Sequence, residues 1–445
     1  MRLRKTITTI VATAILLAGW QLFAVIANQP ELIPSLPRLV RTLCEWLVSG
    51  SFYQSVGATI LRGVLGMSIS FVCAIGMAGL FARFEWVYEL FRPLLAIMRS
   101  IPVISFILLA LIFLNPESIP LMIAFLTMFP LLTENLTRGI LDLRPGLSIM
   151  ARQFHIRRSN VLFQIIYPQL KPFLYSGLAS ATGFGWRAII MGEVLSQCAF
   201  GIGSEMKRAQ NFIAVPELLA WTIVAVFISF FFDKGISKVT DITPKISFAN
   251  EDQTIPTPTL SVLDTKDISY QYGIQHFSHS FQKGIIYGIS APSGKGKTTL
   301  LNLIGGILLP TEGEIHPTRH FGIATIFQQP QLLPYLTAEE NIILPLSSFL
   351  TEEKARRIAQ KHLQEMEMEP FGNRYPKELS YGQQQRIAIA RALAYPSPLL
   401  LMDEPLSALD AELKISMRRE IQNIHKLTGA TIVYVTHDQS EALAM

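Results

Sequence analysis

The sequence predicts two parts: a membrane-embedded bundle of about six α-helices, followed by an α/β domain built around a phosphate-binding loop. Long apolar runs fill the chain before residue 235, so that 50% of the 445 residues are hydrophobic and only 16% are charged. From residue 260 onward, short apolar strands alternate with helical segments. A loop rich in Gly and Lys lies between one such strand, at residues 285–289, and a helix that begins near Lys297.

The apolar runs of the first half are long enough to cross the hydrocarbon core of a bilayer. They cover residues 6–27, 56–81, 94–114, 119–136, 173–197 and 218–232. One such run could be a buried helix of a soluble protein, but this many in succession favour a membrane domain. Residues 25–27 resemble a signal-peptidase site, yet the run before them is long and further spans follow, so we expect an uncleaved first helix. Gly63 and Gly66 predict close helix packing.

Basic residues are concentrated in alternate loops, which predicts that these loops face the cytoplasm. They are Arg2, Arg4, Lys5, Arg83, Arg92, Arg138, Arg144, Arg152, Arg157, Arg158 and Lys171. An even number of spans returns the chain to the cytoplasm near Asp233, so we expect the α/β domain there. Because basic loops explain the net charge of +5, no nucleic-acid partner is needed. The cysteines, Cys44, Cys73 and Cys198, have no metal-binding spacing and are expected to be free thiols.

Two charged residues, Arg187 and Glu193, lie in or near the fifth apolar run. A charge inside a membrane is costly without a partner or water, so it predicts a functional residue. Snorkelling from a helix end is the alternative explanation. Glu193 is the candidate for a translocation path.

The loop at residues 290–300 has the sequence Ser-Ala-Pro-Ser-Gly-Lys-Gly-Lys-Thr-Thr-Leu. It fits the pattern G-x-x-x-x-G-K-[ST] except at the first place, where Ala291 replaces glycine. In such a loop, backbone N–H groups and the following helix N-terminus point at phosphate oxygens. Lys297 is predicted to reach the β- and γ-phosphates of ATP, and Thr298 to bind Mg²⁺. The predicted nucleotide contacts are Ser293, Gly294, Lys295, Gly296, Lys297, Thr298 and Thr299.

A second apolar strand, at residues 399–402, delivers two adjacent carboxylates, Asp403 and Glu404. Asp403 is predicted to hold Mg²⁺, and Glu404 to polarise the attacking water as a general base. A third apolar strand, at residues 431–436, ends at His437. A lone histidine is usually structural, but its place at a strand end after the other motifs favours a catalytic role.

The order of these motifs resembles that of the ABC ATPase family. Residues 379–383, Leu-Ser-Tyr-Gly-Gln, are similar to the family signature L-S-G-G-Q, with Tyr381 in place of the middle glycine. The resemblance implies that the signature contacts the γ-phosphate of an ATP bound to a second subunit. The residues concerned are Ser380, Gly382 and Gln383.

The same resemblance implies four further roles. Tyr272 would stack on adenine, and the 407–410 loop would touch the partner domain. Gln328, which follows an apolar strand, would touch Mg²⁺ and sense the γ-phosphate. His437 would contact the γ-phosphate as the family's switch histidine.

The predicted cytoplasmic loop at residues 138–171 contains a second resemblance. Its 151–168 stretch predicts two short amphipathic helices closed by a proline turn. The loop resembles that of ABC importer permeases, specifically the sulfonate, taurine and nitrate family, whose pattern is E-A-A, three residues, G, nine residues and I-x-L-P. Residues 149–151, His155 and residues 165–168 occupy these places, although the glutamate, glycine and leucine are absent. The resemblance implies that this loop docks in a groove of an ATPase domain.

We therefore expect a permease domain at 1–235, a polar linker at 236–258 and an ATP-binding domain at 259–445. The chain ends at Met445, soon after His437, whereas ABC ATPases usually continue with further strands and a terminal helix. We therefore expect a C-terminally short domain with an exposed sheet edge.

Together the resemblances imply half of an ABC importer in the cytoplasmic (inner) membrane, with ATP and Mg²⁺ as cofactors. It would work as a homodimer or paired with another half-transporter, and receive its solute from an extracytoplasmic substrate-binding protein. The solute would be small, with an anion such as a sulfonate, taurine or nitrate expected. Two alternatives stay open: an ABC exporter, and a truncated or regulatory protein that binds ATP without transport.

Overall fold

The computed structural model describes residues 2–240, 245–253, 262–271, 273–292, 294–316, 323–406 and 411–443. Contacts between residues divide the chain into two compact units. The membrane unit comprises Met1–Leu143 and Gln169–Ile242, and the second unit comprises Arg144–Pro168 and Thr243–Met445. The 144–168 segment, predicted to lie in the permease, is thus packed with the ATP-binding domain.

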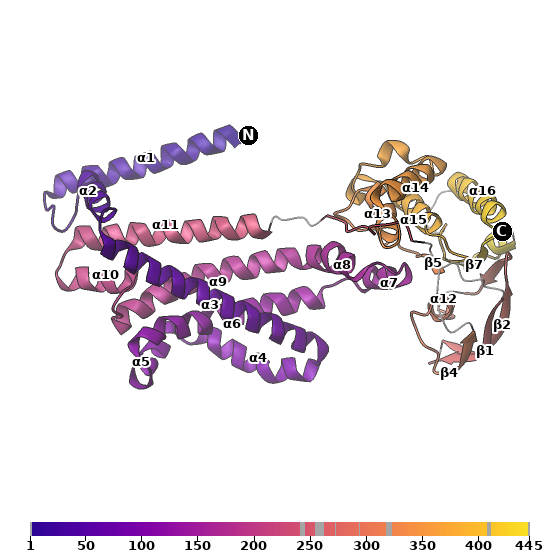
Figure 1. The fold of residues 1–445 in the computed structure, drawn as a ribbon, viewed down its shortest axis with the longest axis horizontal. Helices are drawn as coiled ribbons and strands as arrows, with labels where there is room; N and C mark the ends of the chain where they lie inside the picture. Colours follow the sequence, from indigo (N-terminus) through magenta and orange to yellow (C-terminus); the bar gives the residue numbers. More distant parts are fainter. Residues whose placement is uncertain are drawn as a thin grey trace. The chain divides into compact units, whose positions relative to one another are not determined.

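The membrane unit is entirely helical in its described part (Figure 1). Its helices are α1 Arg2–Ala27, α2 Leu36–Trp46, α3 Gly50–Arg83, α4 Glu85–Ser100, α5 Val103–Phe113, α6 Ile119–Leu141, α9 Tyr167–Ser196, α10 Ile202–Asn211 and α11 Val215–Thr240. A short 3₁₀ turn, Pro116–Ser118, precedes α6. Helix α3 packs along α6, where a Cβ atom on Gly66 would come within 2.7 Å of the Ala124 Cβ. The predicted close helix packing at Gly66 is therefore confirmed.

Three described helices are long and apolar enough to cross a membrane: Gly50–Arg83, Pro116–Leu141 and Val215–Lys238. They correspond to the predicted spans at 56–81, 119–136 and 218–232. The predicted span at 94–114 is not one straight helix, because α4 and α5 meet at a 96° bend next to Pro102. Proline lacks the N–H that would continue the helical ladder, which explains the break.

The two remaining predicted spans do not meet the same criteria. The first contains a shorter apolar helix, Val11–Ala27. The fifth lies in α9, which has 30 residues but is not apolar enough, since Gly, Ser and Thr residues and Arg187 lower its hydropathy. The predicted count of six spans is therefore not confirmed by length and composition.

The second unit contains two sheets (Figure 1). An antiparallel sheet has the order β2-β1-β4, from β1 Val262–Tyr270, β2 Ile274–Gln282 and β4 Glu312–His316. A parallel sheet has the order β3-β7-β6-β5, from β3 Ile286–Ser290, β5 Ile323–Ile326, β6 Leu399–Asp403 and β7 Thr431–Thr436. All residues of β5, β6 and β7 are buried, which explains their continuous apolar sequences.

Helices flank the strands of this unit. They are α7 Pro145–Gln153, α8 Arg158–Asn160, α12 Lys297–Ile304, α13 Ala338–Leu346, α14 Glu352–Glu365, α15 Tyr381–Ala394, α16 Ala411–Thr428 and α17 Gln439–Leu443. Short 3₁₀ turns lie at Glu369–Phe371 and Pro376–Glu378. In register, Ser290 lies opposite Thr436, and Asp403 opposite Val435. The carboxyl ends of β3, β6 and β7 therefore meet at one edge of the sheet.

The 144–168 segment differs in part from its prediction. The first predicted helix is α7, but α8 continues through a π-helical stretch, Val161–Ile166, directly into α9. The predicted proline turn is wrong, because Pro168 lies inside this continuous helical stretch, immediately after its π-helical part. His155, which stands where the permease pattern has glycine, has φ +48°. Glycine adopts this left-handed conformation most readily, so the backbone keeps the shape that the pattern implies.

Candidate functional site

The phosphate loop connects β3 to α12 at the carboxyl edge of the parallel sheet. Gly294 and Gly296 both have φ +81°, a conformation that side chains disfavour. Gly296 also has no room for a side chain, since a Cβ atom there would lie 2.5 Å from the Gly273 carbonyl oxygen. The loop thus needs glycine at this position, and α12 begins with Lys297 immediately after it.

Lys297 is buried beneath this loop. Its Nζ donates to the carbonyl oxygens of Ala291, at 2.8 Å, and Pro292, at 3.2 Å. It also lies 3.4 Å from Glu404 Oε1. The ammonium group therefore spans the loop and the end of β6, where it is positioned to bind an anionic ligand.

Thr298 and Asp403 meet at the same edge. The Thr298 hydroxyl donates to Asp403 Oδ2 at 2.9 Å. Burial raises the pKa of the Asp403 carboxyl, and the bond from Thr298 partly offsets this effect. One hydroxyl and one carboxylate are hard oxygen ligands of the kind that Mg²⁺ shares with phosphate oxygens, so these two residues fit a magnesium ion.

Glu404 contacts the predicted switch histidine. Glu404 Oε2 lies 3.1 Å from His437 Nδ1, while the Glu404 backbone N–H donates to the Val435 carbonyl at 2.9 Å. Glu404 has φ +45°, an unusual conformation for a residue with a side chain. Such strain persists where the surrounding structure fixes it, and it often occurs at functional sites. We call the 290–297 loop together with Thr298, Asp403, Glu404 and His437 the phosphate-loop edge.

The signature residues lie on another part of the unit, at the N-terminus of α15. The Ser380 hydroxyl accepts from the Gln383 backbone N–H at 3.3 Å, and the Gln383 side chain accepts from the Ser380 N–H at 2.9 Å. This reciprocal pair is a capping box. Ser380 is exposed, and Gly382 is half-buried beside it. In the described residues, no hydrogen bond joins Ser380 to the phosphate-loop edge.

Gln328 follows β5 and is exposed. Its backbone carbonyl accepts from the Tyr381 hydroxyl at 2.9 Å, so Tyr381, which replaces a family glycine, ties the signature to the Gln328 segment. The Gln328 side chain makes no hydrogen bond to Thr298 or Asp403 within the described parts of the chain. The role of Gln328 as a Mg²⁺ ligand therefore stays a prediction.

The structure describes only some of the remaining predicted nucleotide-binding residues. Lys295 is exposed and Thr299 is half-buried, on either side of Lys297. Tyr272, Ser293 and the 407–410 loop lie outside the described residues.

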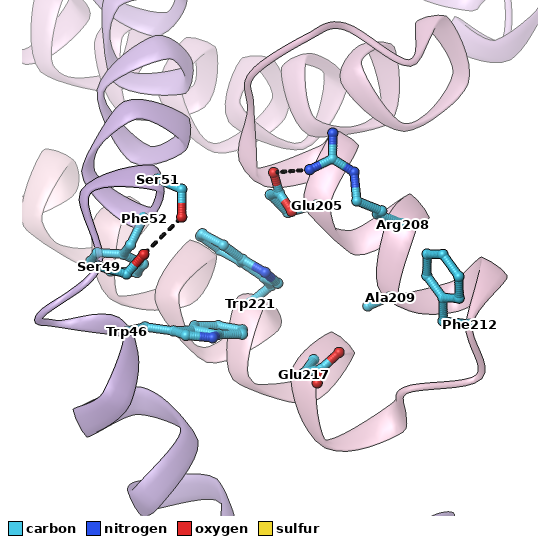
Figure 2. Close-up of a pocket in the computed structure, with 10 residues that line it drawn as sticks. All are labelled: Trp46, Ser49, Ser51, Phe52, Glu205, Arg208, Ala209, Phe212, Glu217 and Trp221. Atoms are coloured by element: carbon cyan, nitrogen blue, oxygen red, sulfur yellow. Dashed lines mark hydrogen bonds and ion pairs between the residues drawn. The ribbon is translucent and has the colours of Figure 1, made fainter.

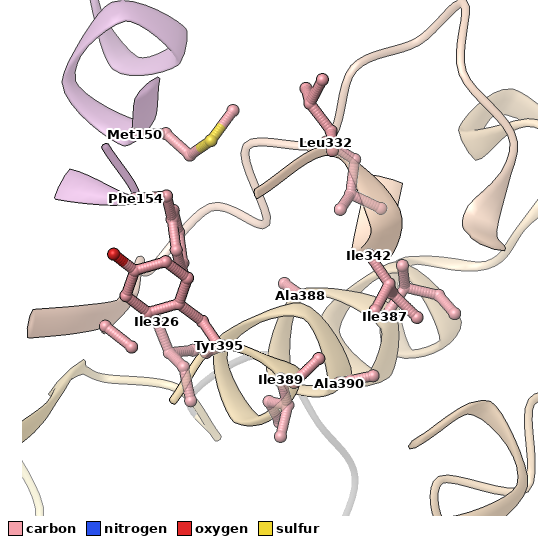
Figure 3. Close-up of a cluster of buried hydrophobic side chains, with 14 of the residues drawn as sticks. Met150, Phe154, Ile326, Leu332, Ile342, Ile387, Ala388, Ile389, Ala390 and Tyr395 are labelled. Carbon is pink, nitrogen blue, oxygen red and sulfur yellow. The ribbon is translucent and has the colours of Figure 1, made fainter. Parts of the chain in front are cut away.

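The 144–168 segment buries an apolar face against the ATP-binding domain. Met150 and Phe154 pack into a hydrophobic cluster with Ile326 of β5 and Tyr395 (Figure 3). The rings of Phe154 and Tyr395 meet edge to face, with centroids 5.4 Å apart. The guanidinium carbon of Arg391 lies over the Phe154 ring, 5.5 Å from its centroid.

Arg391 connects this segment to the chain after Gln328. The side chain is fully buried and donates to the carbonyl oxygens of Gln331, at 2.8 Å, and Pro330, at 2.9 Å. Burial lowers the pKa of the guanidinium to about 9, so it stays protonated at neutral pH. Arg391 thus links α15, the segment after Gln328 and Phe154.

Polar contacts also hold the 144–168 segment. The Asn160 side chain donates to the Ser247 carbonyl and to the Ser347 hydroxyl, both at 2.8 Å, and accepts from the Ser247 N–H at 2.8 Å. The Arg157 N–H donates to Ser348 Oγ at 2.9 Å. Ser247 belongs to the predicted linker. This part of the linker is therefore bonded to Asn160 of α8, which also bonds Ser347 at the end of α13. Nothing in the sequence pattern around Asn160 predicted this role.

Two family models match the chain. Residues 274–407 match the model described as ABC transporter, and residues 68–233 match the binding-protein-dependent transport system inner membrane component. The chain fuses an importer-type permease to an ABC-type ATPase domain. Its apolar helices make it a multi-pass membrane protein.

Curated relatives of the fusion match its ATPase half. A spermidine/putrescine import ATP-binding protein of Nitrosomonas eutropha is 38% identical over 42% of the fusion and 55% of its own length. An Fe(3+) ions import ATP-binding protein of Rhizobium etli is 41% identical over 39% of the fusion and 52% of its own length. The fusion thus spans about half the length of these relatives.

A solved dimeric ATP-binding cassette, in a post-hydrolysis state bound to ADP and Pi, is 34% identical to the fusion. The match has a TM-score of 0.38 and covers 41% of the fusion and 90% of that chain.

Glu193 of the fusion is fully buried in the membrane unit. Its carboxylate accepts from Arg62 Nη1 at 2.7 Å, from the Thr59 hydroxyl at 2.9 Å and from the Gly203 N–H at 2.9 Å. Arg62 also pairs with Glu117 at 2.8 Å. These contacts tie α9 to α3 and to the start of α10. These bonds give Glu193 a structural role, while its place on a translocation path stays a prediction.

A small pocket of about 200 Å³ lies in the same unit. Two of its lining residues, Trp46 and Trp221, are in contact with each other, with ring centroids 4.6 Å apart (Figure 2). Arg208 pairs with Glu205 at 2.9 Å on its rim, and Glu217 lies nearby. No predicted site residue lies in this pocket.

Proposed function

We propose that the fusion is one half of an ATP-driven importer in the cytoplasmic membrane, with its ATPase domain in the cytoplasm. Two copies would form the transporter. The domain limits are proposed as 1–235 for the permease, 236–258 for the linker and 259–445 for the ATPase, with the 144–168 segment docked on the ATPase. The observation that carries this proposal is the set of contacts at the phosphate-loop edge, where Lys297, Glu404 and His437 form a continuous chain.

In the proposed reaction, water attacks the γ-phosphorus of ATP. Its oxygen forms the new P–O bond, the bond to the β-γ bridging oxygen breaks, and Glu404 accepts the proton that the water loses. His437 holds the Glu404 carboxylate in place and contacts the γ-phosphate. Lys297 exchanges its contacts with the loop carbonyls for the β- and γ-phosphates, which are stronger acceptors because they are charged.

The remaining loop residues and Tyr272 would complete nucleotide binding. Backbone N–H groups of residues 293–299 would surround the phosphates, and Tyr272 would stack on adenine. Mg²⁺, held by Thr298 and Asp403 and approached by Gln328, would neutralise charge on the phosphates when bound. These roles rest on the motif positions and, for Thr298 and Asp403, on their direct hydrogen bond.

The signature supports the proposal that two copies act together. Ser380, Gly382 and Gln383 lie at an exposed helix N-terminus, which favours an anion. Because Ser380 is not bonded to the phosphate-loop edge of its own chain, we propose that it binds the γ-phosphate of ATP held by the second copy. Closure of that pair would be transmitted through the 144–168 segment to the permease.

The cargo is proposed to be a small anion such as a sulfonate, taurine or nitrate, delivered by an extracytoplasmic binding protein. This rests on the resemblance of residues 149–168 to that permease family, which the glycine-like backbone of His155 supports. The curated relatives are named for polyamine and iron import, and they match only the ATPase half. Because the match does not include the permease, the names of these relatives do not identify the cargo of this chain.

ATP hydrolysis by the purified fusion in lipid tests the motor. We expect Glu404→Gln to lower turnover by a factor of about 10² or more, because it removes the general base. Glu353→Gln, on the exposed face of α14, is the matched control and should leave turnover unchanged. Equal turnover in the wild type and Glu404→Gln would instead favour a protein that binds ATP without transport.

A further inference from the structure

The membrane unit contains a large cavity between α9 and α11, of about 790 Å³. This volume lies within the range of small-molecule sites. Apolar side chains such as Ile190, Met191, Val226 and Phe230 form most of its wall. Ligand sites typically combine such an apolar wall with a few polar groups that fix the orientation of the ligand.

Two opposite charges line this cavity: Arg187 on α9 and Asp233 on α11. They do not form an ion pair with each other. Both side chains are exposed, and within the described residues neither makes a hydrogen bond or ion pair with another side chain. This contrasts with Glu193 of the same helix, whose carboxylate is fully bonded. Arg187 lies inside a membrane helix, where a charge without a protein partner usually serves a ligand or an ion path, and Asp233 directly follows the apolar run of α11.

The broken helix reaches the same cavity. α5 begins at Val103 after the 96° bend, and Ile104 in its first turn is part of the cavity wall. The N-terminus of a helix carries a partial positive charge. Broken helices with this end at a cavity bind acidic groups of substrates in other transporters. This feature adds to the positive charge of Arg187.

We propose that the cavity binds a small zwitterion, with its acidic group on Arg187 and its ammonium group on Asp233. The short hydrocarbon between them would lie on the apolar wall. An inorganic anion would leave Asp233 without a partner, and a simple amine would leave Arg187 without one. The proposal narrows the cargo of the proposed importer and rests on that function, because the cavity would be part of the path that the cargo takes.

Direct binding tests this assignment without hydrolysis. The full-length fusion in lipid nanodiscs, free of nucleotide, is titrated calorimetrically with 2-aminoethanesulfonate, ethanesulfonate and ethylamine. The wild type should bind the zwitterion roughly tenfold or more tightly than either other probe. Arg187→Gln should lose binding of the zwitterion, whereas Arg187→Lys should keep the order of preference. Arg41→Gln, an exposed arginine paired with Glu45 on α2, is the matched control.

Asp233→Asn provides a readout that misfolding would not produce. It should bind ethanesulfonate as well as the zwitterion, because only the ammonium group loses its partner. Equal affinities of the wild type for the three probes, no binding at all, or an unchanged preference in Asp233→Asn would each overturn the proposal. These titrations contain no ATP and do not depend on hydrolysis. A failure of the proposed ATPase function, measured with Glu404→Gln, can therefore be told apart from a failure of the proposed cargo site.

Discussion

The phosphate-loop edge and the N-terminus of α15 use their polar side chains in different ways. At the phosphate-loop edge, residues of helix α12 and of the ends of β6 and β7 contact one another: Thr298 contacts Asp403, and Glu404 contacts both Lys297 and His437. At α15, Ser380 and Gln383 bond to each other within one helix turn and, among the described residues, to no side chain of the phosphate-loop edge; Ser380 is exposed. The difference indicates that one half of the proposed site is assembled within the chain, while the other half is presented outward.

The strongest test of this difference is Lys297→Ala. Removing the buried ammonium group should lower both nucleotide affinity and turnover, the latter by a factor of about 10² or more, because charge stabilisation of the phosphates is lost. Binding of a fluorescent ATP analogue and phosphate release measure the two effects. Lys295→Ala, an exposed lysine in the same loop, should have a smaller effect on turnover. Equal losses in the two variants would contradict the geometry of the buried lysine.

Ser380→Arg should affect turnover without affecting nucleotide affinity, which would distinguish the N-terminus of α15 from the phosphate-loop edge. Turnover should fall by about tenfold or more, since a bulky cation would replace the hydroxyl that meets the second nucleotide. Nucleotide affinity should stay within about twofold, because Ser380 is not bonded to the phosphate-loop edge. Ser380→Ala controls for loss of the helix cap, which costs about 1 kcal/mol. A parallel loss of affinity in Ser380→Arg would show that the signature acts within its own chain.

The motif residues of both regions could be predicted from sequence because each motif is short and fixes its own backbone. Gly294, Gly296 and the Asp403-Glu404 pair are positioned by the strand and turn in which they lie. The structural role of Asn160 could not be predicted, because its partners are 87 and 187 residues away. The same limit applies to Glu193, whose charge marked it as unusual, while its bonds to Thr59 and Arg62 depend on helix packing.

Arg391 tests how firmly the signature helix is held. Arg391→Met should destabilise the packing of α15 by roughly 2–4 kcal/mol, because two buried carbonyl groups lose their donor. Peptide-resolved amide hydrogen exchange should show faster exchange in α15 and in the segment after Gln328. Arg386→Met, a more exposed arginine of the same helix, should change exchange less. Similar exchange in both variants would show that the Arg391 bonds contribute little.

Asp403 gives the smallest expected effect, at the phosphate-loop edge. Burial raises its pKa above the unfolded value, so the folded protein binds a proton more readily, and the free energy of unfolding rises as pH falls through that pKa. Asp403→Asn removes the buried charge and keeps an acceptor for Thr298. The variant should therefore be slightly more stable than the wild type at neutral pH, with the difference shrinking in acid. Thermal unfolding of the nucleotide-free fusion across this pH range measures it, and a pH-independent difference would contradict the burial effect.

The packing of the 144–168 segment against the ATPase of the same chain has a thermodynamic consequence. When two binding surfaces are joined by a linker, their association is intramolecular and takes place at an effective concentration that reaches the millimolar range for short linkers. A separate permease and ATPase must find one another in the cell, and a strong contact is then required. A covalently joined pair tolerates a weaker contact, which explains how His155 and the missing glutamate of the permease pattern are compatible with docking. Sequence drift in this segment is therefore expected to be greater in fused chains than in transporters assembled from separate subunits.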